Sequence, residues 1–195
     1  MYVYVEKVCV SIISSLYQYL FVSAIMAILF MILYDECKKH GIKNIFYSLL
    51  HNLKTSKEHR RVFILAIYTC LILFRTVFCR QIWGNPIDNV LGNWSFHFSD
   101  GSISTELIEN LFLFIPFSML ALWALRMRIL NGQFTFKNIC CGTIKIAFLF
   151  STLIELCQIF LRVGTFQISD LITNTMGGLL GGVIYYICYK FKHRK

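Results

Sequence analysis

Charged residues are scarce in this chain of 195 residues, where Asp, Glu, Lys and Arg together make up 15%. Soluble proteins carry roughly 25%. Proline is also rare, with two residues in the whole chain, so a long proline-rich linker is excluded. What the chain has instead is apolar sequence, with 57% hydrophobic residues. This composition excludes an ordinary soluble domain and predicts a membrane protein that forms one domain.

The eight cysteines lack the spacing of a metal or redox site, because no CxxC motif and no Cys/His cluster with zinc spacing occurs. A cysteine in an apolar setting usually packs as a small hydrophobe. We therefore expect no metal, no cofactor and no redox role. The cysteines inside apolar runs or near the start of one are Cys70, Cys140, Cys141, Cys157 and Cys188.

Five apolar runs approach the length of about 20 residues that a helix needs to cross a bilayer. They cover residues 10–33, 62–78, 107–125, 139–161 and 171–189. The first run has neither a strongly basic flank nor a small-residue cleavage site, so we interpret it as a retained span and not a signal peptide. The sequence thus predicts an all-α, polytopic membrane helix bundle of about five transmembrane helices.

Basic residues set the direction of these spans. Lys and Arg gather in residues 35–61, in residues 126–138 and in the C-terminal tail, whereas residues 80–106 and 162–170 contain few. By the positive-inside rule, the N-terminus lies outside and the C-terminus inside. The same distribution argues against nucleic acid as the partner that the net charge of +9 would otherwise suggest.

The first basic loop contains an amphipathic segment. Its apolar residues follow the i, i+3, i+4, i+7 rhythm, which predicts a helix. One interpretation places this helix on the inner leaflet with its lysines toward anionic lipid. The alternative is a helix packed beneath the bundle. The apolar positions are Ile42, Ile45, Phe46, Leu49, Leu50 and Leu53.

The last three predicted spans carry polar residues toward their outer ends. In the fourth span, Glu155, Gln158 and Arg162 are spaced by three and four, so they share one helix face. Because an isolated charge at membrane depth is costly, these residues should face those of the neighbouring spans in a shared outer pocket. The predicted ligand-binding residues are Glu109, Asn110, Glu155, Gln158, Arg162, Asp170 and Asn174.

Arg162 is the one cation in this group, and its guanidinium suits any of the three carboxylates. The remaining negative charge requires either a protonated carboxylate or a cationic ligand group, and the sequence leaves both open. Arg75 lies toward the outer end of the second span, where it could approach Glu106 or Glu109.

Backbone features accompany the polar group. Pro116 predicts a kink in the third span and a carbonyl at Phe112 that needs another partner. Such a kink would either widen the outer half of the bundle into a cavity or serve packing alone. Two overlapping GxxxG patterns predict that the fifth span packs closely against the third or fourth. These glycines are Gly177, Gly178, Gly181 and Gly182.

Three motifs follow one another in the last three spans. They are E-N-L-F-L-F-I-P-F from Glu109, E-L-C-Q from Glu155 with Arg162, and D-L-I-T-N-T-M-G-G from Asp170 with Gly181. This ordered set resembles the VanZ-like family of small bacterial membrane proteins over roughly residues 80–189. Members often have glycine after I-P-F, where this chain has Ser118.

The resemblance implies a multi-pass protein of the bacterial cytoplasmic membrane with a role at the cell envelope. The family is named for a protein that raises resistance to teicoplanin, a lipid-bearing glycopeptide. We divide the chain into residues 1–61, a transmembrane helix with a basic loop, and residues 62–195, a VanZ-like four-helix domain with a basic tail.

Several functions fit these observations. The first is a binding protein whose outer pocket holds a lipid headgroup, a lipid-linked envelope precursor or a lipoglycopeptide. The second is an intramembrane enzyme that uses Glu155 or Glu109 as a general base. A structural role through a partner protein and transport are further alternatives. Membrane lipids are the expected partners, and the sequence specifies no oligomeric state.

Overall fold

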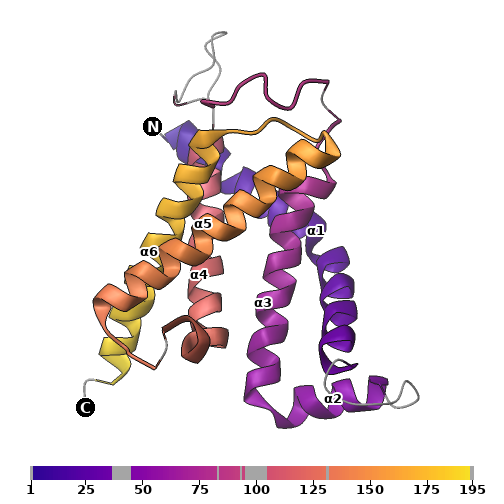
Figure 1. Ribbon diagram of the computed structural model, residues 1–195, viewed down its shortest axis with the longest axis vertical. Helices are drawn as coiled ribbons and strands as arrows, with labels where there is room; N and C mark the ends of the chain where they lie inside the picture. Colours follow the sequence, from indigo (N-terminus) through magenta and orange to yellow (C-terminus); the bar gives the residue numbers. More distant parts are fainter. Residues whose placement is uncertain are drawn as a thin grey trace.

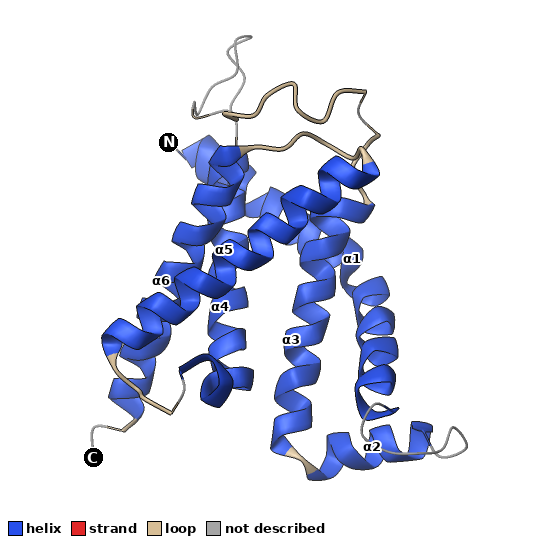
Figure 2. Cartoon of the chain, viewed as in Figure 1, coloured by secondary structure: helices blue, strands red, loops and turns tan. Residues whose placement is uncertain are grey.

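The computed structural model describes residues 2–36, 45–82, 84–92, 94, 105–130 and 132–193. Within these ranges the secondary structure is helical apart from one isolated antiparallel bridge between Ile82 and Val163. The helices pack into one bundle, and the loops that join them lie near its two ends (Figures 1 and 2). The predicted all-α bundle is confirmed.

Six α-helices and one π-helical turn make up the described secondary structure. They are α1 (Tyr2–Glu36), α2 (Ile45–Thr55), α3 (Lys57–Leu73), η2 (Phe74–Phe78), α4 (Glu106–Leu130), α5 (Phe136–Leu161) and α6 (Ile168–Lys192). Four helical segments are long and apolar enough to span a membrane, namely α3 with η2, α4, α5 and α6. In α1 the described apolar segment is shorter and covers Tyr17–Leu33.

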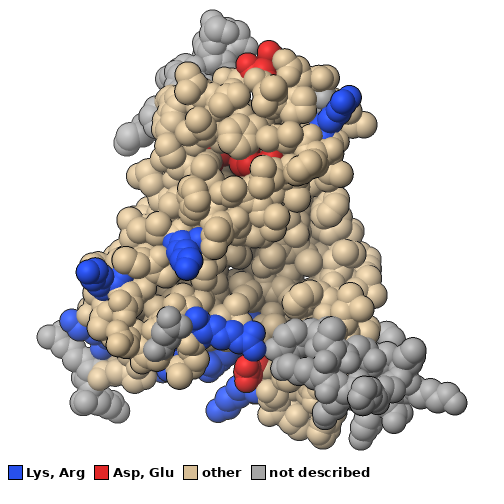
Figure 3. Space-filling view, viewed as in Figure 1, with Lys and Arg blue, Asp and Glu red and all other residues tan. Residues whose placement is uncertain are grey.

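The two chain termini lie at opposite ends of the bundle (Figure 1). Most of the visible Lys and Arg side chains gather at the end that carries α2 and the C-terminus (Figure 3). By the positive-inside rule we call this the inner end, and we call the end with the segment between η2 and α4 the outer end.

Helix α2 lies across the inner end and bears out the amphipathic pattern as a helix (Figure 1). Leu49 is buried and packs with Met31 of α1 and Val62 of α3, whereas Leu50 is 56% exposed. The apolar side of α2 is thus partly packed against the bundle, and the placement of this helix on the inner leaflet stays a prediction. Ile42 and the side chains of Ile45 and Phe46 lie outside the described residues.

The paired glycines of α6 bring three helices close together. A Cβ on Gly177 or Gly181 would collide with backbone carbonyls of α4, at Leu111 and Ile115. Gly178 and Gly182 instead face α5, where a Cβ would collide with the side chains of Ala147 and Thr143. The two GxxxG patterns therefore lie on adjacent stripes of α6, and each stripe admits a different neighbour.

Helix α4 continues through Pro116, and its backbone leaves helical geometry at Leu125, with φ −119° and ψ 21°. The kink is therefore nearer the inner end than the one predicted at Pro116. A membrane helix can keep helical angles at proline when nearby carbonyls find other donors. Here the Tyr68 hydroxyl of α3 donates at 2.9 Å to the Leu113 carbonyl, which is one residue after the Phe112 carbonyl that lacks a donor at Pro116.

We expect Gly181→Ala to destabilise the protein by about 1–3 kcal/mol, because the added methyl group must displace the α4 backbone. Thermal unfolding in detergent micelles measures this effect. Gly84→Ala is the matched control, because a Cβ there meets nothing within 4 Å. Equal unfolding midpoints for the two variants would show that the close approach of α4 and α6 does not limit stability.

Candidate outer polar site

A cavity of about 290 Å³ opens at the outer end between α1, η2 and α4. Its lining is almost entirely polar, which is unusual for a surface at membrane depth. The lining residues are Ser14, Gln18, Tyr19, Arg75, Thr76, Arg80, Glu106, Glu109 and Asn110. Of the residues predicted from the sequence, Glu109 and Asn110 line this cavity.

An ion pair between η2 and α4 forms one wall of the cavity. Arg75 donates a hydrogen bond to one carboxylate oxygen of Glu109, and the Thr105 hydroxyl donates to the other. The side chains of Arg75 and Glu109 are 17% and 9% exposed, so the pair is largely withdrawn from solvent. Glu109 also lies in the first turn of α4, where the helix dipole favours negative charge. The predicted proximity of Arg75 to Glu109 is confirmed.

A second ion pair connects the segment after η2 to α6. The Arg80 guanidinium lies 3.9 Å from the Asp170 carboxylate, which occupies the first turn of α6. Asn110 of α4 lies close to this carboxylate. Gly164, at φ +71°, lies so close to Arg80 that a Cβ there would collide with its side chain. Arg80 is therefore held between the cavity and the loop that joins α5 to α6.

Glu155 has a separate role. It is 1% exposed, and one of its carboxylate oxygens accepts a hydrogen bond of 3.0 Å from the backbone N–H of Gln167. Gln167 is the N-cap residue of α6 and makes no side-chain cap of its own. The carboxylate from α5 therefore stabilises the start of α6, where unpaired N–H groups and the dipole both favour negative charge.

Gln158 and Asn174 connect helices below the cavity. The Gln158 amide donates to the Thr76 carbonyl in η2 at 2.9 Å, and the Asn174 amide donates to the Ser151 hydroxyl at 2.9 Å. A π-helical turn disturbs the regular backbone ladder, and Gln158 supplies a donor to one of its carbonyls. Both amides are buried, so these bonds fix η2 against α5 and α5 against α6.

The structure corrects the pairing predicted for Arg162. Helix α5 ends at Leu161, and Arg162 adopts left-handed backbone angles of φ 54° and ψ 42°. The Arg162 N–H bonds to the Ile159 carbonyl and the Val163 N–H to the Gln158 carbonyl, which is the Schellman arrangement. The Arg162 side chain is exposed, and Arg75 and Arg80 pair with Glu109 and Asp170 in its place.

The predicted residues therefore separate into three sets. Glu109, Asn110 and Asp170 belong to the cluster with Arg75 and Arg80. The buried residues Glu155, Gln158 and Asn174 join helices, and Arg162 lies apart from both sets. Sequence reasoning missed Arg80 because it follows the second apolar run and was counted with the outer loop.

The segment between η2 and α4 is hydrogen-bonded to the loop between α5 and α6. Gly164 N–H donates to the Gln81 carbonyl at 3.1 Å, and Phe166 N–H donates to the Pro86 carbonyl at 2.8 Å. The Ile168 N–H donates to a further carbonyl of the same segment at 2.8 Å. These backbone bonds fix the segment that carries Arg80, and so they position its guanidinium beside α6.

The described side chains offer no group of three or more His, Cys, Asp or Glu residues that could hold a metal ion. Glu109, which lines the cavity, and Asp170 already face arginines, and nearby arginines disfavour a cation site. The cavity lining contains hydrogen-bond donors and acceptors, and it includes both cationic and anionic side chains.

The fold and this site define an α-helical membrane protein with a charged cluster at one end of the bundle. Within this class, the family described as VanZ/LLP1 matches residues 17–189, and the chain belongs to that family. It is also 30% identical to Protein VanZ of Enterococcus faecium over 143 residues, which are 68% of this chain and 77% of that protein. The match begins within α1, so it extends beyond the motifs in the last three spans. No solved structure matches the chain.

We expect the ion pair between Arg75 and Glu109 to stabilise the bundle, because each side chain neutralises the charge of the other. Arg75→Gln alone should lower the free energy of unfolding by about 3 kcal/mol, because Glu109 is then left with its charge partner removed. Glu109→Gln alone should also destabilise, and the double variant should lose less than the sum. A double-mutant cycle of unfolding in mixed micelles measures this coupling. Strict additivity would show that the two side chains do not interact.

Proposed function

We propose that this protein binds the polar headgroup of a lipid or of a lipid-linked envelope ligand in its outer cavity, and thereby contributes to resistance to teicoplanin-type glycopeptides. The bacterial cytoplasmic membrane is the proposed location. The observation that carries the proposal is the polar cavity of about 290 Å³, with a buried ion pair in its wall, at one end of an apolar bundle.

The lining chemistry supports a headgroup that carries both charge and neutral polar groups. Arg75 and Arg80 can donate to an anionic group such as a phosphate, and Glu106 can accept from an amine or hydroxyl. Asn110 adds a neutral amide. Because cationic and anionic side chains balance across the lining, a zwitterionic or sugar-bearing headgroup suits it better than a simple ion. In this proposal the anion-binding role predicted for Arg162 belongs to Arg75 and Arg80.

The surface beside the cavity supports a ligand with apolar chains. Gln18 and Tyr19 of α1 line the cavity, and the next turn of α1 exposes Phe21, at 77% of its surface. Leu20 and Ile25 are also exposed on this helix. Acyl or prenyl chains of a bound ligand would lie along these residues while its headgroup occupies the polar lining. Occupancy of this kind could limit the access of a glycopeptide to the cell surface.

Binding is better supported than catalysis by a carboxylate base. Glu155 is buried, accepts a hydrogen bond from the Gln167 backbone and does not line the cavity. Glu109 is engaged by both Arg75 and Thr105. A general base must reach the proton that it abstracts. Because both carboxylates are occupied by these structural partners, neither is open to a substrate proton.

Teicoplanin susceptibility of a Gram-positive host that expresses the protein tests the proposal. The double variant Arg75→Gln/Glu109→Gln keeps both side chains polar and removes the two charges of the ion pair in the cavity wall. We expect it to reach the membrane at normal abundance and to return the inhibitory concentration to that of the host alone, because charged hydrogen bonds to the ligand, about 1.5–3 kcal/mol each, are lost.

Arg162→Asn is the matched control, since Arg162 is exposed outside the cavity and Asn tolerates its left-handed backbone. It should keep full resistance. Full resistance in the double variant at equal membrane abundance would contradict the proposal, as would a loss in Arg162→Asn that matches the loss in the double variant.

A further inference from the structure

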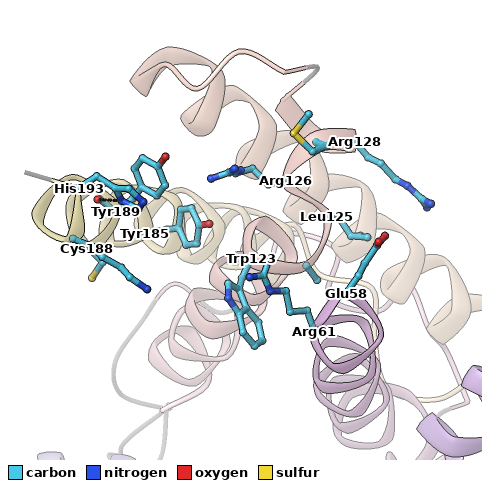
Figure 4. A pocket seen from close by; sticks show the side chains of 13 residues that line it. Glu58, Arg61, Trp123, Leu125, Arg126, Arg128, Tyr185, Cys188, Tyr189 and His193 are labelled. Atoms are coloured by element: carbon cyan, nitrogen blue, oxygen red, sulfur yellow. Dashed lines mark hydrogen bonds between the residues drawn. The ribbon is translucent and has the colours of Figure 1, made fainter. Parts of the chain in front are cut away.

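A second and larger cavity, of about 580 Å³, lies at the inner end between α3, α4 and α6. The kink of α4 lies beside this cavity, because the backbone leaves helical geometry at Leu125, and the segment after the kink carries Arg126 and Arg128 at one side of the opening. Figure 4 shows Arg61 entering from α3 and Arg126 pointing toward the tyrosines of α6. Side chains from three helices thus meet around one hollow.

The charge of this cavity is strongly one-sided. Arg61, Arg126, Arg128 and Lys192 line it together with a single acid, Glu58. The positive-inside rule predicts basic residues in the loops at the inner end. It does not predict that they gather around one cavity. Three cations in excess around one concave surface create a positive potential that attracts an anion.

Aromatic rings hold two of the arginines in place. The Arg61 guanidinium lies 5.2 Å from the ring centroid of Trp123, and that of Arg126 lies 5.5 Å from the ring centroid of Tyr189. Tyr185 lines the same cavity. A guanidinium stacked on a ring still presents its N–H groups along its edge, in the planar fork that matches phosphate oxygens.

The position of the cavity indicates which phosphate-bearing molecule could reach it. Its residues lie at the inner ends of α3, α4 and α6, where transmembrane helices meet lipid headgroups. Its rim includes exposed apolar side chains, with Met127 at 69% and Trp123 at 37% of their surfaces. Anionic phospholipids of the cytoplasmic leaflet offer a phosphate at this depth and acyl chains for such a rim.

We infer that the basic cavity at the inner end binds the phosphate headgroup of an anionic phospholipid through Arg61 and Arg126, with Arg128 and Lys192 at its rim. The cavity volume suits a headgroup of this size. This site is separate from the outer cavity, at the opposite end of the bundle, and does not depend on what the outer cavity binds.

Native mass spectrometry of the purified full-length protein tests the inference, with dioleoyl phosphatidylglycerol titrated into a neutral detergent. We expect binding that Arg61→Gln/Arg126→Gln weakens by roughly tenfold or more, because two charged donors are removed. Arg60→Gln/Lys137→Gln is the matched control, since it removes two exposed inner-end charges outside the cavity. The control should bind nearly as well as the unmodified protein.

Two further measurements in the same experiment identify the ligand. Dioleoyl phosphatidylcholine should bind more weakly than phosphatidylglycerol, and inorganic phosphate at millimolar concentration should not displace the lipid. If Arg61→Gln/Arg126→Gln does not fold, Arg128→Gln/Lys192→Gln serves instead, because both side chains are exposed at the rim. Equal loss in the cavity and control variants, equal binding of the two lipids, or ready displacement by phosphate would each overturn the inference.

Discussion

The cost of placing a charge in lipid is the constraint on which this structure depends. Glu109 and Asp170 are both buried near the outer end of apolar helices. Either carboxylate would be unfavourable there without a partner. The chain provides Arg75 and Arg80 from one short stretch after α3, and each guanidinium meets a different helix. This stretch therefore fixes α4 and α6 relative to each other, and a polar cavity remains between it, α1 and the outer end of α4.

Close packing and polar bonding support one another across the bundle. The glycines of α6 allow α4 and α5 to approach, so the amides of Gln158 and Asn174 come within reach of Thr76 and Ser151. In lipid, where no hydrophobic effect drives helices together, packing and interhelical hydrogen bonds supply most of the association. The cavities at the two ends remain where this packing ends, at the outer loop and beyond the kink of α4.

Hydropathy and residue spacing predicted the helices and the buried carboxylates and amides of the described residues, because membrane length and the cost of charge act locally on the sequence. They placed Arg75 within reach of Glu106 or Glu109, but they did not predict the pairing of Arg80 with Asp170. The i, i+4 relation between Gln158 and Arg162 holds only while the helix continues, and α5 ends one residue too early. Arg80 could not be predicted from a periodic pattern, because backbone hydrogen bonds between two loops place it beside Asp170.

The most direct test of the central claim is a measurement of nitrogen–carbon dipolar coupling by solid-state NMR in lipid bilayers, between arginine guanidinium and carboxylate groups. The account predicts short contacts from Arg75 to Glu109 and from Arg80 to Asp170, the latter near 3.9 Å between nitrogen and oxygen. Signals lost in Arg75→Gln and Arg80→Gln assign them. A strong coupling between Arg162 and any of these carboxylates, with none from Arg75 or Arg80, would contradict the account.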